Sequence, residues 1–224
     1  MSDFDVEKYR EYFRTKYVTQ DAGYRYLGIT NGKLYLATII FVTISAPTLA
    51  LLQIETFHFY FFCLLPFYFI IANLVEYVLH RYPMHHKMKG LGFLFEHVTV
   101  HHYFYGNEFY YNEEPRDNMA IFLPLLYFFF ISFDIFLIAA VIYLFADLEN
   151  ALFFAAFAYL YYLMYEFLHF SSHAKEGSFL KKIPFIRKLS QNHLNHHKLE
   201  LMETYNFNIT FPIFDKLLGT YYKA

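Results

Sequence analysis

The sequence predicts an all-α, multi-pass membrane protein in which about four transmembrane helices carry a histidine-rich helical cap. Hydrophobic residues make up 57% of the 224 residues and charged residues only 17%, whereas a soluble domain has roughly 45–50% apolar residues. The apolar residues lie in four long runs, and the segments between and after these runs are rich in histidine. A single soluble core cannot bury runs of this length, so a bilayer is the expected solvent.

The four apolar runs cover residues 36–54, 58–79, 119–146 and 151–168. Each predicts one span, because a helix needs about 20 apolar residues to cross the bilayer core. The third run contains Pro124 and Asp134. It is expected to be tilted, kinked or locally broken, since proline removes a helix hydrogen bond and a carboxylate is costly in hydrocarbon.

The whole chain, residues 1–224, is expected to form one integral-membrane domain. Residues 1–35 are a polar N-terminal segment without the features of a cleaved signal peptide, so the first span is expected to act as its own insertion signal. Residues 80–118 and 169–224 are expected to form the cap.

The distribution of Lys and Arg predicts the orientation of the chain. These residues precede the first span, lie between the second and third spans and follow the fourth, whereas residues 53–57 and 147–150 contain none. Positive charges in short loops stay on the cytoplasmic side. Both termini and the cap are therefore expected to be cytoplasmic, in the endoplasmic reticulum of a eukaryote or the inner membrane of a bacterium. The short outer connections predict tight hairpins of the first span with the second and of the third with the fourth.

Charge and cysteine content exclude several classes of function. The formal net charge is −2, and nucleic-acid binding depends on clustered Lys and Arg that neutralise phosphates, so no nucleic-acid partner is expected. Cys63 is the single cysteine. It gives neither a disulfide framework nor a thiolate metal site, and it is expected to be a small buried hydrophobe.

Histidines are the main chemical signal in the sequence. Of the twelve, the predicted topology puts eleven on one side, and only His58 falls on the opposite rim. The eleven form four clusters, which are His80, His85 and His86 after the second span, His97, His101 and His102 in the middle loop, His169 and His173 at the end of the fourth span, and His193, His196 and His197 in the tail.

The spacing within these clusters suits metal binding, because residues three or four apart share one face of a helix. This spacing pairs His97 with His101, His169 with His173, and His193 with both His196 and His197. Adjacent histidines point about 100° apart on a helix, so each doublet can serve two neighbouring metals. His80 and His85 are five apart across Pro83, where the helix is expected to end and a turn to bring His85 back.

Ten histidines are therefore predicted to bind two metal ions, because neutral imidazole is the commonest protein metal ligand and two five- or six-coordinate ions use about ten. The predicted ligands are His80, His85, His97, His101, His102, His169, His173, His193, His196 and His197. His58 and His86 fall outside the pattern. Imidazole accepts zinc, copper, iron or nickel, but a large nitrogen-only site beside lipid suits O2 activation better than structural zinc.

Three further residues are expected to support the ligands. Glu166 stands three residues before His169 and Glu76 four before His80, so each can orient its imidazole by hydrogen bonding. Asn195 lies within the last cluster and is expected to bond to water or to the backbone. No side chain is expected to act as nucleophile or base.

These motifs resemble those of the fatty acid hydroxylase and sterol desaturase superfamily. The resemblance runs from about residue 73 to the C-terminus and includes the closing segment NFNITFPIFDKLLGT. It implies four spans, a cytosolic cap and a dimetal centre, taken to be iron with zinc as a substitute in purified protein. It also implies that O2 and external electrons are used to hydroxylate an unactivated C–H of a fatty acyl chain, sphingolipid or sterol.

The chain departs from the family in two places. It has Asn208 where the family often has glycine after the closing aromatic residue, and it has no fused cytochrome b5 motif. Electrons are therefore expected from a separate cytochrome b5-like or ferredoxin-like protein.

Two alternative functions remain open from the sequence. Desaturation of a lipid or sterol begins with the same hydrogen abstraction as hydroxylation, and positioning of the substrate decides between them. A non-enzymatic metal transporter or sensor would instead place ionisable groups along the spans, where Asp134 is nearly the only candidate.

Overall fold

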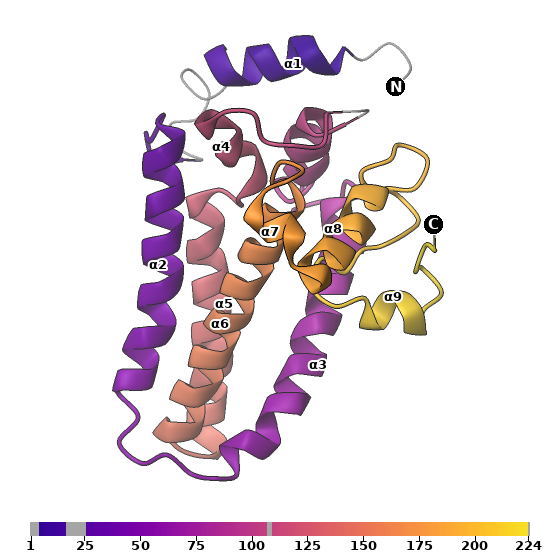
Figure 1. Ribbon diagram of the computed structural model, residues 1–224. Helices are drawn as coiled ribbons and strands as arrows, with labels where there is room; N and C mark the ends of the chain where they lie inside the picture. The colour runs from indigo at the N-terminus through magenta and orange to yellow at the C-terminus, as the bar shows by residue number, and fades with distance from the viewer. Residues whose placement is uncertain (1–4, 17–25, 107–108, 224) are drawn as a thin grey trace.

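The computed structural model describes residues 5–16, 26–106 and 109–223 (Figure 1). The predicted N-terminal segment is therefore described only in part, because residues 1–4 and 17–25 lie outside these ranges. All regular structure within the described residues is helical. Four of the helices are long and apolar enough to cross a membrane, which confirms the predicted fold class.

The long helices of the four candidate spans are α2 (Gly32–Leu52), α3 (Phe61–Leu79), α5 (Leu125–Phe145) and α6 (Leu148–Ser172). The second and third candidate spans extend beyond these helices, to Phe61–Met84 and Pro115–Phe145. Polar residues at the borders of the apolar runs define two of the helix starts. The Asn31 side chain accepts hydrogen bonds from the backbone N–H groups of Lys33 and Leu34, and the Asp147 side chain accepts one from Asn150 N at 2.8 Å. Such caps satisfy N–H groups that have no partner within the helix.

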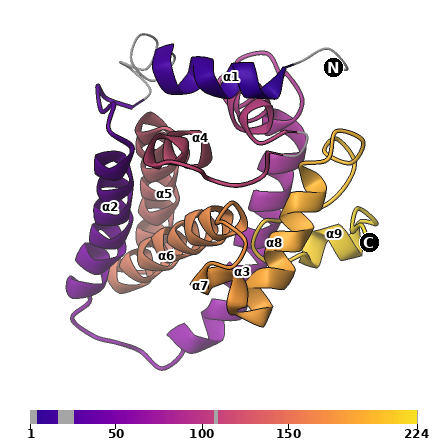
Figure 2. The same ribbon diagram turned by 45° about the horizontal axis from the view of Figure 1, so that its top comes forward.

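Helix α6 lies at the centre of the spans, with α2 and α3 on opposite sides of it (Figures 1 and 2). The predicted hairpin of the first two spans is therefore wrong, because α2 packs against α6 rather than against α3. The physical reason is the connection: α2 ends at Leu52 and α3 begins only at Phe61, which leaves enough chain to reach across α6. The hairpin of α5 with α6 is confirmed, since only Ala146 and Asp147 separate these helices.

The third span is locally broken at its proline, as expected, within a candidate span of Pro115–Phe145 that contains the predicted start at residue 119. A short helix, α4 (Asn118–Ile121), precedes an extended stretch, and α5 begins only after Pro124. Buried polar side chains support the break, because the Tyr35 hydroxyl donates to the Leu123 carbonyl at 2.9 Å and Glu166 lies beside the Leu123 backbone. Asp134 causes no break, since it is exposed on an uninterrupted part of α5.

Two segments near the histidines are π-helical. Helix α3 continues directly into the π-helix η2 (His80–Met84), and the middle loop contains the π-helix η3 (His97–His102). The helix ends close to Pro83, as expected, because η2 ends at Met84 and the turn that follows brings His85 back to His80. A π-helix has a wider turn with hydrogen bonds from residue i to i+5, and such turns are often found at functional sites.

The remaining helices form a cap at one end of the spans (Figure 2). They are α1 (Val6–Tyr12), η4 (Pro115–Asp117), α4, α7 (Phe179–Lys182), α8 (Pro184–His196) and α9 (Ile213–Leu217). A buried aromatic cluster that includes Phe13, Tyr35, Phe104 and Tyr105 joins the cap to α2. The cytoplasmic location of this cap stays a prediction.

Two residues singled out in the sequence lie away from the cap. His58 lies in the connection at the opposite end of the spans, where its ring stacks on Tyr60 with centroids 5.2 Å apart. Cys63 is exposed on α3, so its predicted burial is wrong. The outer surface of a span faces hydrocarbon, and a small apolar side chain is therefore accommodated there without burial in protein.

Candidate metal centre

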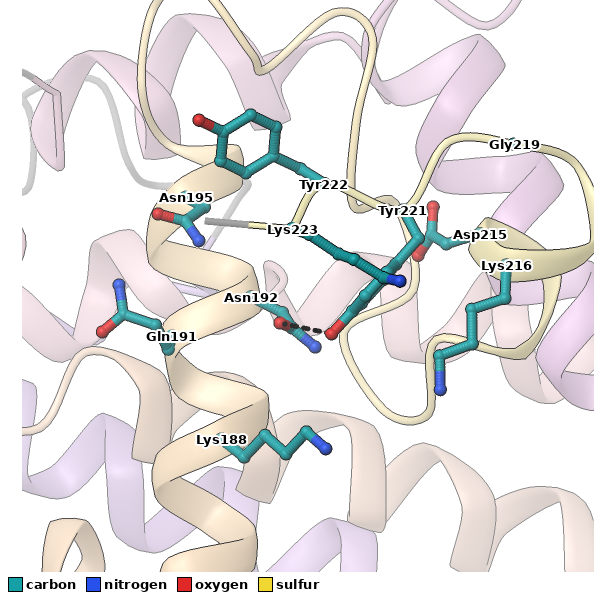
Figure 3. A pocket seen from close by; sticks show the side chains of 10 residues that line it. All are labelled: Lys188, Gln191, Asn192, Asn195, Asp215, Lys216, Gly219, Tyr221, Tyr222 and Lys223. Carbon is teal, nitrogen blue, oxygen red and sulfur yellow. Dashed lines mark hydrogen bonds between the residues drawn. The ribbon is translucent and has the colours of Figure 1, made fainter.

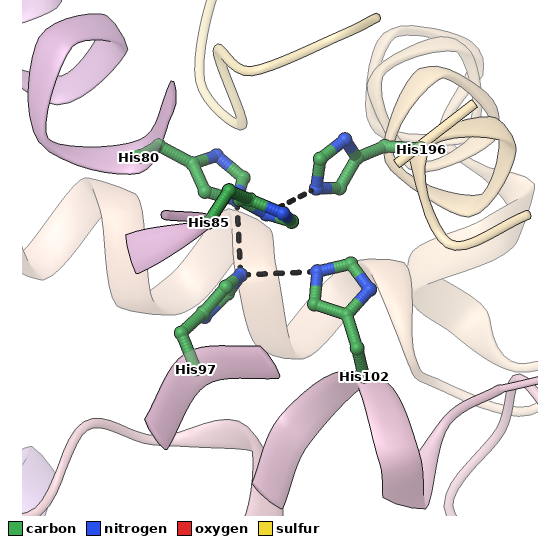
Figure 4. Close-up of side chains that lie close together, drawn as sticks. All are labelled: His80, His85, His97, His102 and His196. Carbon is green, nitrogen blue, oxygen red and sulfur yellow. Dashed lines mark hydrogen bonds between the residues drawn. The ribbon is translucent and has the colours of Figure 1, made fainter. Parts of the chain in front are cut away.

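The ten histidines predicted as ligands lie together in the cap and at the adjoining ends of α3 and α6. Each of them is exposed by 6% or less. They form two groups of five, within each of which the facing ring nitrogens lie within 4.8 Å of one another. Group one is His80, His85, His97, His102 and His196 (Figure 4), and group two is His101, His169, His173, His193 and His197.

Helix geometry explains how the chain divides the histidines. Group two takes two pairs spaced by four residues on α-helices, His169 with His173 on α6 and His193 with His197 at the end of α8. Group one takes two pairs spaced by five residues, which are His80 with His85 at η2 and His97 with His102 on η3. The wider π-helical turn brings residues five apart onto one face.

Each group is completed by one member of a histidine doublet. The doublets 101–102 and 196–197 are divided between the groups, as expected from the angle between adjacent side chains on a helix. The predicted pairings of His97 with His101 and of His193 with His196 are wrong, because the two residues of each pair lie in different groups. The π-helical turn at η3 pairs His97 with His102 instead.

Within both groups the Nε2 atoms face one another. In group one the Nε2 atoms of His80 and His97 are 2.9 Å apart, and those of His85 and His196 are 3.0 Å apart. In group two the Nε2 atom of His101 lies 3.0 Å from those of both His169 and His197. The imidazoles therefore converge on two common centres through the same ring atom.

Backbone carbonyls hold the opposite side of five of these rings. His80 Nδ1 faces the Phe207 carbonyl, and the other four contacts are His101 with Ala120 at 2.8 Å, His173 with Tyr110 at 2.8 Å, His196 with Tyr205 at 2.7 Å and His197 with Tyr105 at 3.2 Å. A carbonyl oxygen only accepts, so each Nδ1 carries the proton and donates it. The Nε2 atom of each of these five rings then presents a lone pair to the centre.

The contact between His101 and His197 shows that the residues of group two fit a metal ion. Both Nδ1 atoms donate to carbonyls, so two Nε2 lone pairs face each other at 3.0 Å and form no hydrogen bond. Burial lowers the pKa of His101 to about 3 and the pKa of His197 well below its ordinary value. Both rings are therefore neutral near pH 7, and a shared cation relieves the repulsion between the lone pairs. The donor set fits a metal ion.

The two groups are immediate neighbours. The rings of His102 in group one and His197 in group two stack at an interplanar angle of 20° with their centroids 4.2 Å apart. Because these rings lie against each other while their Nε2 atoms point to different centres, the arrangement suits a dinuclear site.

Glu76 supports group one indirectly. Its carboxylate accepts hydrogen bonds from Ile209 N at 2.5 Å and from Thr210 N at 2.9 Å, and it also accepts from the hydroxyls of Thr210 and Tyr161, each at 2.6 Å. The predicted hydrogen bond between Glu76 and His80 is not formed. Glu76 instead fixes the segment that directs the Phe207 carbonyl at His80.

Asp215 fixes the same segment from the other side, and sequence reasoning missed it. Its buried carboxylate accepts hydrogen bonds from Phe207 N at 2.9 Å and Asn208 N at 2.8 Å. The Asn208 amide donates to the Asn73 carbonyl at 2.9 Å, so it ties the segment to α3. The left-handed residue of this turn is Asn206, with φ of 60°, which explains why Asn208 is tolerated where the family often has glycine.

Glu166 and Asn195 do not orient their neighbouring histidines by hydrogen bonds. Glu166 accepts from the Tyr162 hydroxyl at 2.6 Å, and neither His169 Nδ1 nor Asn195 Oδ1 has a hydrogen-bond partner in the part of the chain that the structure describes. The contribution of Glu166 is to the break before α5.

Group two is supported by the loop after η3 and by α4, because Tyr105 and Tyr110 of the loop and Ala120 of α4 supply the three carbonyls that its histidines contact. Arg10 of α1 clamps the loop. Its guanidinium donates to the carbonyls of Phe109 at 3.1 Å and Tyr111 at 3.3 Å and lies 3.5 Å from Asp117 Oδ2. The Arg10 side chain is buried in spite of its charge.

A second arginine completes this clamp. Arg14 Nε donates to Asp117 Oδ1 at 2.8 Å, and Asp117 also accepts from the backbone of Glu113 at 2.8 Å. Sequence reasoning missed Arg10 and Asp117. In the sequence, these two residues are marked only by their position in charged segments. The positive-inside rule uses such segments to predict orientation and does not single out individual residues.

A small cavity of about 30 Å³ reaches both groups from the side of the spans. It contacts His97 of group one and His101 of group two. The rest of its lining comes mainly from apolar residues at the ends of the spans and in the loops, namely Met84, Leu94, Val100, Met119, Ala120, Ile121, Phe122, Leu123 and Pro124, with Tyr26, Glu96 and Tyr127. The cavity has room for about one water-sized group.

Comparison with known proteins agrees with this site. The family model for fatty acid hydroxylases matches residues 65–220, a range that contains all ten histidines of the two groups. No curated protein and no solved structure matches the chain. The chain belongs to the fatty acid hydroxylase family, within the sterol desaturase/fatty acid hydroxylase superfamily.

Proposed function

We propose that this protein is a membrane-bound di-iron oxygenase that hydroxylates an unactivated C–H bond of a lipid. The observation that carries this proposal is the pair of neutral imidazoles, His101 and His197, whose Nε2 lone pairs face each other at 3.0 Å within two adjoining sets of five histidines. Such an array is stable around cations. Membership of the fatty acid hydroxylase family favours iron as the cation and a lipid as the substrate.

The ten histidines of the two groups hold the metal ions through Nε2. When bound, two iron ions supply the reduction of O2 and the abstraction of hydrogen from carbon. The overall reaction consumes the C–H bond, one O2, two electrons and two protons, and it yields the C–OH bond and one water. Carbonyl contacts at Nδ1 keep five of these rings oriented, which is the usual arrangement for metal-bound histidine.

The substrate is a fatty acyl chain, a sphingolipid or a sterol in this proposal. The small cavity that contacts His97 and His101 is lined by Leu123 and Pro124 next to the start of α5, and its volume of about 30 Å³ suits a single methylene group of the substrate beside the histidines. Its apolar lining excludes water from the reacting carbon. The position of that carbon relative to the metals decides between hydroxylation and desaturation, and the family match favours hydroxylation.

The electrons come from a separate protein of the cytochrome b5 or ferredoxin kind in this proposal. The described residues contain no third cluster of histidine, cysteine or carboxylate ligands that could hold a redox metal besides groups one and two.

Lipid profiling under labelled oxygen tests the proposed function. Cells that express the wild-type protein under ¹⁸O2 are expected to accumulate a lipid with one ¹⁸O atom, and cells that express His197→Ala are not. His58→Ala is the matched control, because this residue lies at the opposite end of the spans. Metal flux into vesicles without any oxidised lipid would support the transporter alternative instead and end the proposal.

A further inference from the structure

A wide hollow lies on the outer side of α8, away from the histidine centres. Its volume is about 800 Å³, and it lies between α8, α9 and the C-terminal tail (Figure 3). Its lining residues are mostly polar or basic: Lys188, Gln191, Asn192, Asn195, Asp215, Lys216, Gly219, Tyr221, Tyr222 and Lys223.

The hollow carries an excess of positive charge. Lys188, Lys216 and Lys223 are exposed around it, and no ion pair joins them to a carboxylate among the residues that the structure covers. Asp215 does not balance them, since its carboxylate already accepts from two backbone N–H groups and from the Thr220 hydroxyl at 2.8 Å. The three ammonium groups therefore have no carboxylate partner among the described residues, and the contact of Lys216 Nζ with the Tyr221 ring, 5.3 Å from its centroid, leaves its positive charge unneutralised.

A buried amide adds a further donor. Asn192 is 8% exposed, and its Oδ1 accepts from the Tyr221 hydroxyl at 3.4 Å. Its Nδ2 has no hydrogen-bond partner among the described residues. Asn192 lies one helical turn after Lys188 on α8, so both side chains lie on the face of α8 that lines the hollow. Ammonium and amide N–H donors together suit an oxyanion such as phosphate.

A second hollow, of about 690 Å³, extends the basic surface along α8. Lys188 and Gln191 line both hollows, and Lys181, Lys182 and Arg187 also line the second one. Lys181 is mostly buried and donates to the Ser172 carbonyl at 2.8 Å. Lys182 and Arg187 are exposed, and the one carboxylate in the lining is Glu176, which accepts from the Tyr111 hydroxyl at 2.8 Å, so positive charge exceeds negative charge along this face of α8.

The first hollow lies at the edge of the membrane-spanning region. Phe211, just before α9, packs against Phe69 of α3 with ring centroids 5.2 Å apart and against Phe185 of α8 at 5.5 Å. Leu217 and Leu218, which follow Lys216, are 70% and 53% exposed. Lysines above exposed apolar side chains match the boundary between lipid headgroups and hydrocarbon.

We propose that this hollow binds the phosphate group of an anionic glycerophospholipid. Lys188, Lys216 and the Asn192 amide contact the phosphate, and the acyl chains lie along Leu217 and Leu218. The exposed leucines favour a lipid over an acidic protein, because the latter would leave them without an apolar partner. The inference does not depend on the proposed catalytic function, since none of these residues belongs to either histidine group.

Native mass spectrometry of the purified full-length chain tests this inference. The detergent-solubilised protein is offered phosphatidylglycerol and phosphatidylcholine with identical acyl chains, and it is expected to retain phosphatidylglycerol in preference. A membrane-surface lysine contributes about fivefold to binding of an anionic lipid. The double substitution Lys188→Gln/Lys216→Gln is therefore expected to weaken retention by roughly 25-fold.

The matched control is Lys87→Gln/Lys89→Gln, which removes two exposed lysines from the loop after η2 and is expected to leave retention unchanged. Metal content and melting temperature of each variant report on folding, and Lys223→Gln in the tail is a milder variant if the double substitution unfolds the protein. Equal retention of the two lipids, or unchanged retention in the Lys188→Gln/Lys216→Gln and Lys223→Gln variants, would overturn the inference. Displacement of the lipid by an equal concentration of glycerol 3-phosphate would assign the hollow to a soluble phosphate instead.

Discussion

The two histidine groups contain the same number and kind of ligands but are held by different parts of the chain. In group one, His80 and His196 contact carbonyls of the segment after α8, which Glu76 and Asp215 fix in place. In group two, the carbonyls come from Tyr105 and Tyr110 of the loop after η3 and from Ala120 of α4. The metal affinity of each centre can therefore be lowered separately by a substitution in its own support, although the two centres have the same kind of ligands and their rings are in contact.

The supports also differ in how far they reach along the chain. The segment that supports group one lies within residues 65–220, the range that the family model matches. The clamp on the group-two loop uses Arg10, which lies before that range. The N-terminal helix thus adds a support for group two that the family match does not cover.

Ligand removal is expected to have the largest effect and to separate neighbours in the sequence. His101→Ala and His102→Ala should each reduce the metal content from two ions per chain toward one and lower turnover at least about hundredfold, since a ligand contributes more than the 10–100-fold of its supporting residues. The double variant His101→Ala/His102→Ala should lose both ions. Metal analysis of the purified variants measures this.

Double variants within one group give the control. His101→Ala/His169→Ala removes two ligands of group two and is expected to lose no more metal than His101→Ala alone. Loss of both ions from this variant would show that the ten histidines act as one undivided site.

Glu76→Gln is expected to weaken group one selectively. The glutamine amide places an N–H donor where backbone N–H groups and hydroxyls all donate, so the segment with the Phe207 carbonyl should shift. Metal affinity of group one should fall about tenfold while group two keeps its ion. Equilibrium dialysis against iron measures both affinities. Glu203→Gln, at an exposed position after α8, should behave as wild type.

Arg10→Ala is the corresponding change for group two. It leaves Asp117 buried with one arginine fewer, which is expected to destabilise the protein by about 3 kcal/mol and to weaken the group-two ion by roughly tenfold. Arg10→Lys should restore part of both. Lys8→Ala removes an exposed charge from the same helix and should change neither; a selective loss from group one would contradict the assignment.

Acidification is expected to have the smallest effect, and the same one on both groups. Burial lowers the pKa of His101 in group two to about 3 and the pKa of His102 and His196 in group one well below its ordinary value. Protons compete with a metal only near or below the pKa of the ligand. Metal content after dialysis should therefore change less than about twofold between pH 7 and pH 5, whereas release centred near pH 6.5 would indicate ordinary exposed histidines.

Hydropathy and spacing were sufficient to predict much of this molecule. Apolar runs predicted four spans because length and composition alone determine whether a helix suits a bilayer. The histidines that converge are the ten predicted from their clustering. Side chains that share a helix face at the same end of the spans are close together in space, so they were expected to meet. Pro124 correctly marked a disturbance of the third span.

Packing and local helix type could not be predicted in the same way. Which span lies beside α6 depends on side-chain fit between apolar surfaces that look alike in sequence, so α2 and α3 were wrongly paired. The five-residue spacings at η2 and η3 were misinterpreted because a π-helix has no propensity signal of its own. Arg10 and Asp117 lie more than a hundred residues apart, and no local pattern links them.

The division of each histidine doublet has a consequence for biosynthesis. Group one needs residues from His80 to His196, and group two needs residues from His101 to His197. Neither set of five is complete until the ribosome has synthesised the chain through α8 to His196 and His197. Metal binding by either full set must therefore follow the synthesis of α8, and a chain that stops before α8 leaves both centres without part of their ligands.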